Sequence, residues 1–237
     1  IFGVVNVVLL QPLPYESPER LVAITESDAQ RKVQSMAVSG PNFLDWRSQA
    51  QSFERMAAID SEENFNLTGG DFPERVKGAA VSEDFFLTLG AAPAVGRAFL
   101  SEEAKPGAAP VVMLSHALWR RRFNGDRGVV GQTIRVNGES ATVVGVMPPS
   151  FQYPADAELW MPFASALNQF NRSLYMLKVI ARLKPGATIT QARAELETIA
   201  QRLARQYPET NKDRGVHLAR LQDDLVGDVK PALQALL

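Results

Sequence analysis

The sequence predicts a mixed α/β fold, of the α+β class, with two lobes. Three observations lead to this prediction. A strand–helix–strand pattern occupies residues 16–60, a similar pattern follows residue 170, and the segment between them is rich in short strands. Two similar units at the ends of the chain predict one lobe made from both, and the middle of the chain predicts an inserted second lobe.

The first strand–helix–strand unit begins with an apolar run at Leu21–Glu26, which favours a strand. The polar stretch at 28–34 then predicts a loop. Ser39 is suited to cap a helix over Pro41–Gln49, because proline is tolerated in the first turn of a helix. Met56–Asp60 is expected to complete the unit as its second strand.

The predicted insert opens with two further strands, over 62–70 and Arg75–Val81. Ser82 is expected to begin a short helix that Gly90 ends, since glycine adopts the left-handed backbone that follows a helix. Residues 91–109 are rich in glycine, proline and alanine, which is typical of a surface connection.

The centre of the insert carries the most regular pattern of the chain. Val111–Leu114 is a short apolar run that predicts a buried strand, and Ser115 is a natural cap for a helix over His116–Phe123. The arginines at the end of this helix are favoured by its dipole. The sequence Asn124-Gly125-Asp126 predicts that the helix ends there.

A hairpin is expected next. Asn137-Gly138 joins the strand-like runs Thr133–Val136 and Glu139–Met147, and this dipeptide suits a turn in which both residues have positive φ. Pro148-Pro149 is expected to end the second strand, because proline donates no hydrogen bond to a sheet. Glu158–Phe163 predicts a short strand that closes the insert.

The second strand–helix–strand unit contains the clearest helix of the chain. A strand is expected over Leu174–Leu183, and Thr188 and Gln191 have the spacing of a capping box at the start of the helix. One face of the helix is apolar at intervals of three and four residues: Ile189, Ala192, Leu196, Ile199, Ala200, Leu203 and Tyr207. Pro208 is expected to end it, and Val216–Leu221 to form a final strand.

Composition excludes several classes of protein. With 237 residues, 46% apolar and 22% charged, the chain can bury a sizeable core and is expected to be globular. Its net charge is −1 and it has no extended basic block, so no nucleic-acid partner is expected. The sequence has no cysteine, which excludes disulfides, thiol catalysis and cysteine-ligated metals.

The polar candidates for chemistry all have a structural alternative that the sequence favours. Ser115 and His116 lack the sequence signature of a hydrolase nucleophile. His116 and His217 are the two histidines of the sequence, which is too few for a histidine-rich metal site. Arg120–Arg122 could hold a phosphate but fit a solvated helix end. The acidic cluster of Asp223, Asp224 and Asp228 could hold a divalent ion but fits a solvated linker.

The sequence therefore predicts no catalytic, cofactor-binding or metal-binding residue, no cofactor and no enzymatic activity, and it leaves substrate- or partner-binding residues unassigned. No phosphate-binding loop of the P-loop type occurs. The three tryptophans, Trp46, Trp119 and Trp160, lie in apolar surroundings and are expected in the core.

The apolar run at Ile1–Leu10 has two interpretations. It is too short to span a bilayer, which takes about 20 apolar residues. It also lacks the basic region and cleavage site of a signal peptide. It is either a buried strand or core helix, or the outer end of a membrane helix that leaves the bilayer at Gln11-Pro12-Leu13-Pro14. Pro231–Leu237 is a second apolar segment.

A chain of motifs in fixed order resembles a known family. LSHALWRRRF, VVGQTIRVNG and VVGVMPPSFQYP follow one another through the insert, and FGVVNVVLLQPLPY precedes them near the start of the chain. Together they resemble the periplasmic core domain of MacB/FtsX-like ABC transporter permeases, which lies between the first and second membrane helices.

The resemblance implies a two-lobed periplasmic domain in which a porter-like subdomain of βαβ units, from both chain ends, carries an inserted strand-rich subdomain. Residues 1–15 end a membrane helix, 16–60 and 170–225 form the porter-like subdomain, 61–169 form the insert, and 226–237 lead into a further membrane helix.

The resemblance also implies a function and partners. The domain would relay ATP-driven motion to substrate or partner proteins outside the membrane, in efflux or export. ATP hydrolysis would belong to a separate ATP-binding domain or subunit. The permease would be homodimeric, held in the cell inner membrane by helices that flank this domain, and could work with a periplasmic adaptor or a substrate protein.

Two other functions stay open on the sequence alone. One is a free-standing periplasmic ligand-binding module, which would need a signal peptide and a closed pocket. The other is a hydrolase with a scattered active site, which would need a buried carboxylate pair or a contact between serine and histidine.

Overall fold

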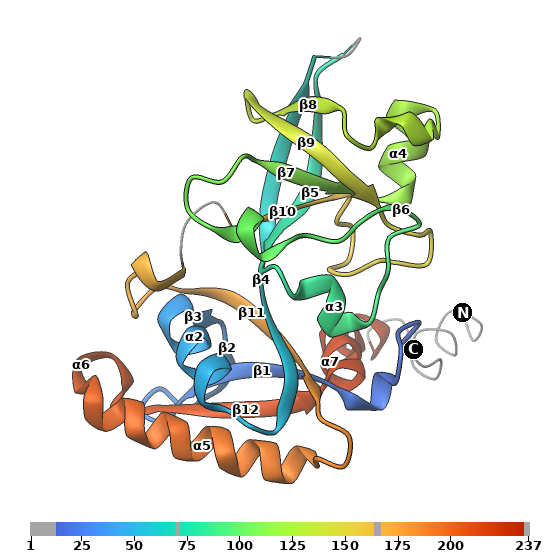
Figure 1. The fold of residues 1–237 in the computed structure, drawn as a ribbon. Coiled ribbons are helices and arrows are strands. Elements are labelled where there is room, and N and C mark those ends of the chain that lie inside the picture. Colours follow the sequence, from blue (N-terminus) through green and yellow to red (C-terminus); the bar gives the residue numbers. More distant parts are fainter. Residues whose placement is uncertain (1–12, 70–71, 164–166, 235–237) are drawn as a thin grey trace.

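The computed structural model describes residues 13–69, 72–163 and 167–234. Figure 1 shows two lobes, with one long strand running from the lower into the upper. Twelve strands of the described chain belong to a single hydrogen-bonded sheet. The prediction of a mixed α/β fold with two lobes is confirmed. The apolar run at Ile1–Leu10 lies outside the described residues, as do positions 235–237 of the C-terminal apolar segment.

The first lobe, at the bottom of Figure 1, is built from segments far apart in the sequence. Its four main strands are β1 (Leu21–Asp28), β4 (Phe53–Thr68), β11 (Tyr175–Leu183) and β12 (Arg214–Arg220). They lie in the order β12-β1-β11-β4, and each neighbouring pair is antiparallel. Helix α2 (Gly40–Gln49) follows the first strand and α5 (Ile189–Gln206) follows the third. This is the topology of a ferredoxin-like, split βαβ fold.

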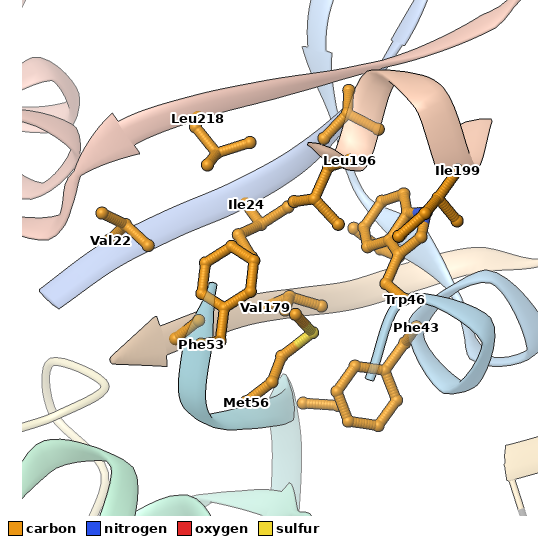
Figure 2. Close-up of a cluster of buried hydrophobic side chains, with 14 of the residues drawn as sticks. Val22, Ile24, Phe43, Trp46, Phe53, Met56, Val179, Leu196, Ile199 and Leu218 are labelled. Atoms are coloured by element: carbon orange, nitrogen blue, oxygen red, sulfur yellow. The ribbon is translucent and has the colours of Figure 1, made fainter. Parts of the chain in front are cut away.

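One face of this sheet is covered by α2 and α5, and the core between them is apolar. Phe43 and Trp46 from α2 are 0% and 1% exposed, and they meet Leu196 and Ile199 from α5 above the strands (Figure 2). Both helices begin as predicted: Ser39 Oγ accepts from Asn42 N, and Thr188 and Gln191 form a capping box. Local capping signals and apolar periodicity therefore account for this half of the lobe.

The second lobe contains a barrel. It adds β5 (Glu74–Val81), β7 (Val111–Leu114), β8 (Thr133–Val136), β9 (Glu139–Val146) and β10 (Leu159–Pro162) to the upper part of β4. The pairing runs β4-β5-β10-β7-β9-β8, and β8 pairs with β4 again, so the ring closes. Helix α4 (His116–Phe123) is capped by Ser115 as predicted, and Asn137 and Gly138 both have positive φ in the predicted hairpin.

The interior of the barrel is a separate apolar cluster. Its members come from all the strands of the ring, and Leu118 of α4 and Val129 pack against them. The strand residues are Phe65, Leu67, Val76, Val112, Leu114, Val136, Ala141, Val143, Val146 and Leu159. Glycine at position 78 of β5 lets the Phe65 ring pack closely against the strand, because a Cβ there would lie only 2.6 Å from that ring.

Two predictions about strands were wrong. The expected loop at 28–34 contains the end of β1 and the start of β2 (Val33–Met36), whose side chains are largely exposed and so lack an apolar pattern. The two strands expected over Met56–Asp60 and 62–70 are one strand, β4, with a shift of register between Asp60 and Glu63. The expected surface connection at 91–109 is largely exposed, and it also includes the two-residue strand β6 (Val95–Gly96) and a 3-10 turn at Ser101–Ala104.

Two predictions about helix starts were also wrong. Helix α3 (Phe85–Leu89) follows Asp84, and Ser82 Oγ instead accepts from Ala58 N, which joins β4 to the end of β5. Leu221 does not end a strand but begins α7 (Leu221–Gln234), where a linker was expected. The acidic residues in its first turn are favoured by the helix dipole. The described chain also contains the short strand β3 (Val38–Ser39) and the one-turn helix α6 (Pro208–Asn211).

Candidate functional site

The junction between the two lobes is filled by a cluster of aromatic side chains, which we call the interlobe core. Phe86 of α3 lies at its centre. Its ring centroid is 5.0 Å from that of Phe85, 5.5 Å from those of Phe99 and Phe151, and 5.9 Å from that of Trp160. The Trp160 indole nitrogen donates to the Tyr153 carbonyl oxygen at 3.1 Å. The predicted burial of Trp160 is confirmed, and the ring is 0% exposed.

Both lobes contribute to the interlobe core. From the sheet of the first lobe come Leu21, Ala23, Ala57, Ile59 and Ile180, all on the face opposite α2 and α5. From the outer wall of the barrel come Ala79, Met113 and Val144. Since burying an apolar side chain of this size stabilises by about 1.5–3 kcal/mol, separating the lobes would expose a large apolar area. The two lobes are therefore expected to move as one body.

Both ends of the described chain attach to the same core. Leu13 and Tyr15 are half-buried against it, and the Tyr15 ring centroid lies 6.0 Å from that of Phe151. Leu221 of α7 is fully buried in the core and Leu225 packs against it. Burial raises the pKa of the Tyr15 hydroxyl above its ordinary value. Figure 1 shows the start of the described chain and α7 on the same side of the molecule.

A buried arginine ties the N-terminal segment to this junction. Arg182 of β11 is 4% exposed, and its Nε donates to the Thr88 carbonyl oxygen at 2.9 Å. Its Nη1 reaches the Ser17 carbonyl oxygen at 3.5 Å. Burial lowers the pKa of Arg182, although an arginine remains protonated at neutral pH. Strand β11, helix α3 and the segment before β1 are thus joined through one side chain.

Two ion pairs bridge the lobes beside the core. Arg47 of α2 contacts Glu83 at 3.2 Å, and Arg55 of β4 contacts Asp84 at 3.1 Å. Because these side chains are partly exposed, each pair contributes at most about 1 kcal/mol. The first pair joins α2, and the second joins β4, to the residues just before α3, while the aromatic cluster supplies most of the stabilisation.

A second polar cluster lies within the first lobe, around the fully buried Glu26. Its Oε1 accepts from Ser39 N at 3.0 Å and from Asn42 Nδ2 at 2.9 Å. Asn42 Oδ1 in turn accepts from Arg172 Nη1 at 2.6 Å, and Arg172 pairs with Asp45 at 2.7 Å. This network joins β1 and the start of α2 to the segment through which the chain returns from the second lobe.

Burial raises the pKa of Glu26. The hydrogen bonds from Ser39 and Asn42 and the charges of Arg214 and Arg172 lower this pKa, but burial has the larger effect. A raised folded-state pKa means that the folded protein binds this proton more tightly than the unfolded chain. The contribution of Glu26 to stability is therefore fully present below its unfolded pKa, about 4.3, and is lost as pH rises through the folded pKa.

We expect Glu26→Gln to be more stable than the wild type at neutral pH, by about 1 kcal/mol, because it keeps the acceptor and removes the buried charge. The difference should shrink at about pH 4, where Glu26 is protonated. Urea unfolding at both pH values measures it, with the exposed Glu197→Gln as control. A variant less stable than wild type at neutral pH would show that the charge itself stabilises the fold.

The side chains considered for hydrolase chemistry do not form a catalytic arrangement. Ser115 Oγ accepts from Leu118 N at 3.1 Å, as a helix cap, and the His116 ring packs against Trp119 with centroids 5.5 Å apart. His217 lies exposed on β12, opposite Thr25 of β1. In the described part of the chain, no three acidic or histidine side chains are grouped to hold a metal ion.

The other candidates take structural positions. Arg121 pairs with Glu74 at 2.5 Å and with Glu158 at 2.7 Å, and Arg122 contacts Glu74 at 3.3 Å. Trp46 is buried as predicted, whereas Trp119 is only partly buried at the edge of the barrel core. Asp223 and Asp224 lie in the first turn of α7, and Asp228 falls within the same helix.

Sequence reasoning missed Arg182 and Glu26 as central residues. A signal was present for Arg182, because the run Val179–Leu183 is apolar at nearly every position, which is typical of a strand buried on both faces. A charged side chain within such a run needs partners from other segments. Those partners, Thr88 and Ser17, are distant in sequence and could not be named from it.

Comparison with known proteins identifies the family. The sequence model of the MacB-like periplasmic core domain matches residues 1–199. The chain belongs to this family. It therefore is a periplasmic core domain of a MacB-like permease and not a catalytic domain, and its resemblance to MacB/FtsX-like permeases is confirmed.

A curated MacB relative shows how much of such a protein this chain represents. The macrolide export ATP-binding/permease protein MacB 1 of Yersinia pestis bv. Antiqua (strain Antiqua) is 27% identical over 150 residues. The alignment covers 62% of this chain and 23% of the relative. The MacB-like domain thus matches less than a quarter of the relative's length. In the described residues, no helix has both the length and the apolar character needed to cross a membrane.

Three solved structures share the fold. A domain of a Porphyromonas gingivalis protein described as a permease aligns with a TM-score of 0.66 at 15% identity, covering 87% of this chain and 93% of that one. The periplasmic region of MacB from Actinobacillus actinomycetemcomitans aligns with a TM-score of 0.62 at 13% identity, covering 94% and 97%. The extracellular domain of the ABC-type transporter YknZ from Gram-positive bacteria gives 0.58 at 11% identity, covering 83% and 99%.

Proposed function

We propose that this MacB-like domain relays ATP-driven motion of flanking membrane helices to substrate or partner proteins outside the cell inner membrane, in efflux or export. One observation carries the proposal. The N-terminal residues Leu13 and Tyr15 and the C-terminal helix α7 pack against the same interlobe core. A displacement of either segment would act directly on the core that both lobes share.

The remaining parts of the proposal concern the whole permease. ATP hydrolysis belongs to a separate ATP-binding domain or subunit, the permease is a homodimer, and a periplasmic adaptor or substrate protein receives the motion. The division into residues 16–60 with 170–225 and an insert at 61–169 also belongs to the proposal. It is supported by the separate apolar cores of the ferredoxin-like sheet and of the barrel.

Topology of the full-length protein tests this proposal. Exposed positions of the domain, such as Glu139 and Arg205, would be changed to cysteine. Intact spheroplasts that carry each variant would then be treated with a membrane-impermeant thiol reagent. We expect labelling from outside, with a cysteine placed in the ATP-binding region protected until the cells are lysed. Release of the segment as a soluble mature protein would instead support a free-standing ligand-binding module and overturn the proposal.

A further inference from the structure

An open groove is bordered by barrel elements at the end farthest from the first lobe, and β8 among them lies at the top of Figure 1. We call it the distal groove. It has a volume of about 860 Å³ and is bordered by the end of β4, the start of β5, the end of α4 and β8. The lining side chains that matter here are Phe72, Glu74, Arg121, Arg122 and Arg135.

The charges of the distal groove are mainly positive. Three arginines and one carboxylate, that of Glu74, line it, and Glu158, outside the lining, also pairs with Arg121. Glu74 contacts both Arg121 and Arg122, which fixes the two guanidinium groups at one wall. Arg135 of β8 is exposed, and the described chain places only the Gly138 carbonyl oxygen at its Nη1, at 3.5 Å. An acidic ligand would complement the positive charge that Glu74 and Glu158 leave unbalanced, chiefly that of Arg135.

The rim of the groove carries an exposed aromatic ring. Phe72 is 79% exposed, more than any other large apolar side chain of the described residues. Its backbone is held in place, since Arg122 Nη1 donates to the Phe72 carbonyl oxygen at 3.1 Å. Aromatic residues and arginines are enriched at the centres of protein–protein interfaces, and a fixed backbone lowers the entropy cost of binding.

We propose that the distal groove binds an acidic segment of a partner polypeptide. Carboxylates of the segment pair with Arg135 and with the neighbouring Arg122, and an apolar side chain packs on Phe72. A small molecule would stay largely in solvent in so open a groove, whereas sites for such ligands bury most of their surface. The inference rests on the proposed function, because it names the chemistry of the partner that receives the motion.

Binding of a defined peptide to the 237-residue chain tests the inference. The probe is a short fluorescein-labelled peptide in which glutamate alternates with valine, and fluorescence anisotropy gives its Kd. We expect Arg135→Glu and Phe72→Ala each to weaken binding about tenfold, which corresponds to about 1.4 kcal/mol. Arg205→Glu, an exposed change on α5 in the other lobe, is the matched control and should bind like wild type. All three positions are exposed, so the thermal unfolding midpoints should agree.

Three outcomes would overturn the inference. The first is no binding by the wild-type chain, and the second is equal weakening in the Arg205→Glu control. The third is displacement of the peptide by inorganic phosphate or by anionic phospholipid vesicles at equivalent charge, which would show a general anion site. The assay uses this chain alone, so its outcome is independent of the topology experiment, and failure of one proposal is distinguishable from failure of the other.

Discussion

The variant Gly78→Ala is expected to destabilise the barrel strongly, although it adds a single methyl group. A Cβ at this position would lie 2.4 Å from the Leu159 carbonyl oxygen and 2.6 Å from two atoms of the Phe65 ring. Leu159 is the backbone partner of Gly78 in the β5–β10 ladder, so it cannot move away without breaking the ring of strands. Overpacking of this kind costs about 3 kcal/mol, and the free energy of unfolding in urea measures it.

Gly227→Ala is the matched control, because a Cβ at Gly227 meets no atom within 4 Å. This residue lies in α7, where alanine is the better helix former by about 1 kcal/mol, so the control should keep or raise stability. If Gly78→Ala unfolded with a free energy within about 0.5 kcal/mol of wild type, the barrel wall would be more adaptable than its geometry indicates.

The second large effect is expected for Phe86→Ala in the interlobe core. Phe86 is fully buried and touches four other aromatic rings, so truncation leaves a cavity between the lobes. Replacing a buried phenylalanine by alanine costs about 3–5 kcal/mol. Thermal unfolding should show a lower midpoint, and in the full-length permease the variant should transmit motion poorly.

Leu87→Ala provides the comparison for Phe86→Ala, since it is the next residue of the same helix and its side chain is 44% exposed. It should change stability by less than about 1 kcal/mol. Equal losses in the two variants would mean that α3 contributes through its backbone and not through the interlobe core.

Local signals predicted many of the elements correctly. The capping box at Thr188 and Gln191, the cap at Ser115 and the turn at Asn137-Gly138 each act over a few residues, so a single sequence contains all the information they need. The apolar face of α5 was equally clear, because apolar residues at intervals of three and four over five turns indicate a helix and not a strand.

Non-local contacts could not be predicted in the same way. Strand β2 is largely exposed and forms because it pairs with β1, and the barrel closes because β8 reaches β4 across an interval of more than 60 residues. Helix α7 begins where acidic residues indicated a linker, and its buried Leu221 and the packed Leu225 explain why it forms. These features depend on surfaces that only the folded chain brings together.

The candidate site shows the same limit. The sequence favoured a structural role for Ser115 as a helix cap, and the structure has that cap, with the His116 ring packed against Trp119. The sequence did not indicate that Tyr15 and Leu225 pack against the same core, because such contacts depend on how distant segments pack together in the folded chain. Phe72 and Arg135 are unremarkable in sequence and become a candidate interface only when the barrel places them beside one groove.

The distance between the lobes during ATP turnover tests the central claim most directly. The 237-residue sequence contains no cysteine, so spin labels can be attached within it at Glu139→Cys in the barrel lobe and Arg205→Cys in the sheet lobe. Pulsed electron paramagnetic resonance on the full-length permease would compare the nucleotide-free and ATP-bound states. We predict the same interlobe distance distribution in both, because the interlobe core joins the lobes into one body. A shift of the distribution on ATP binding would contradict the relay of motion through a rigid domain.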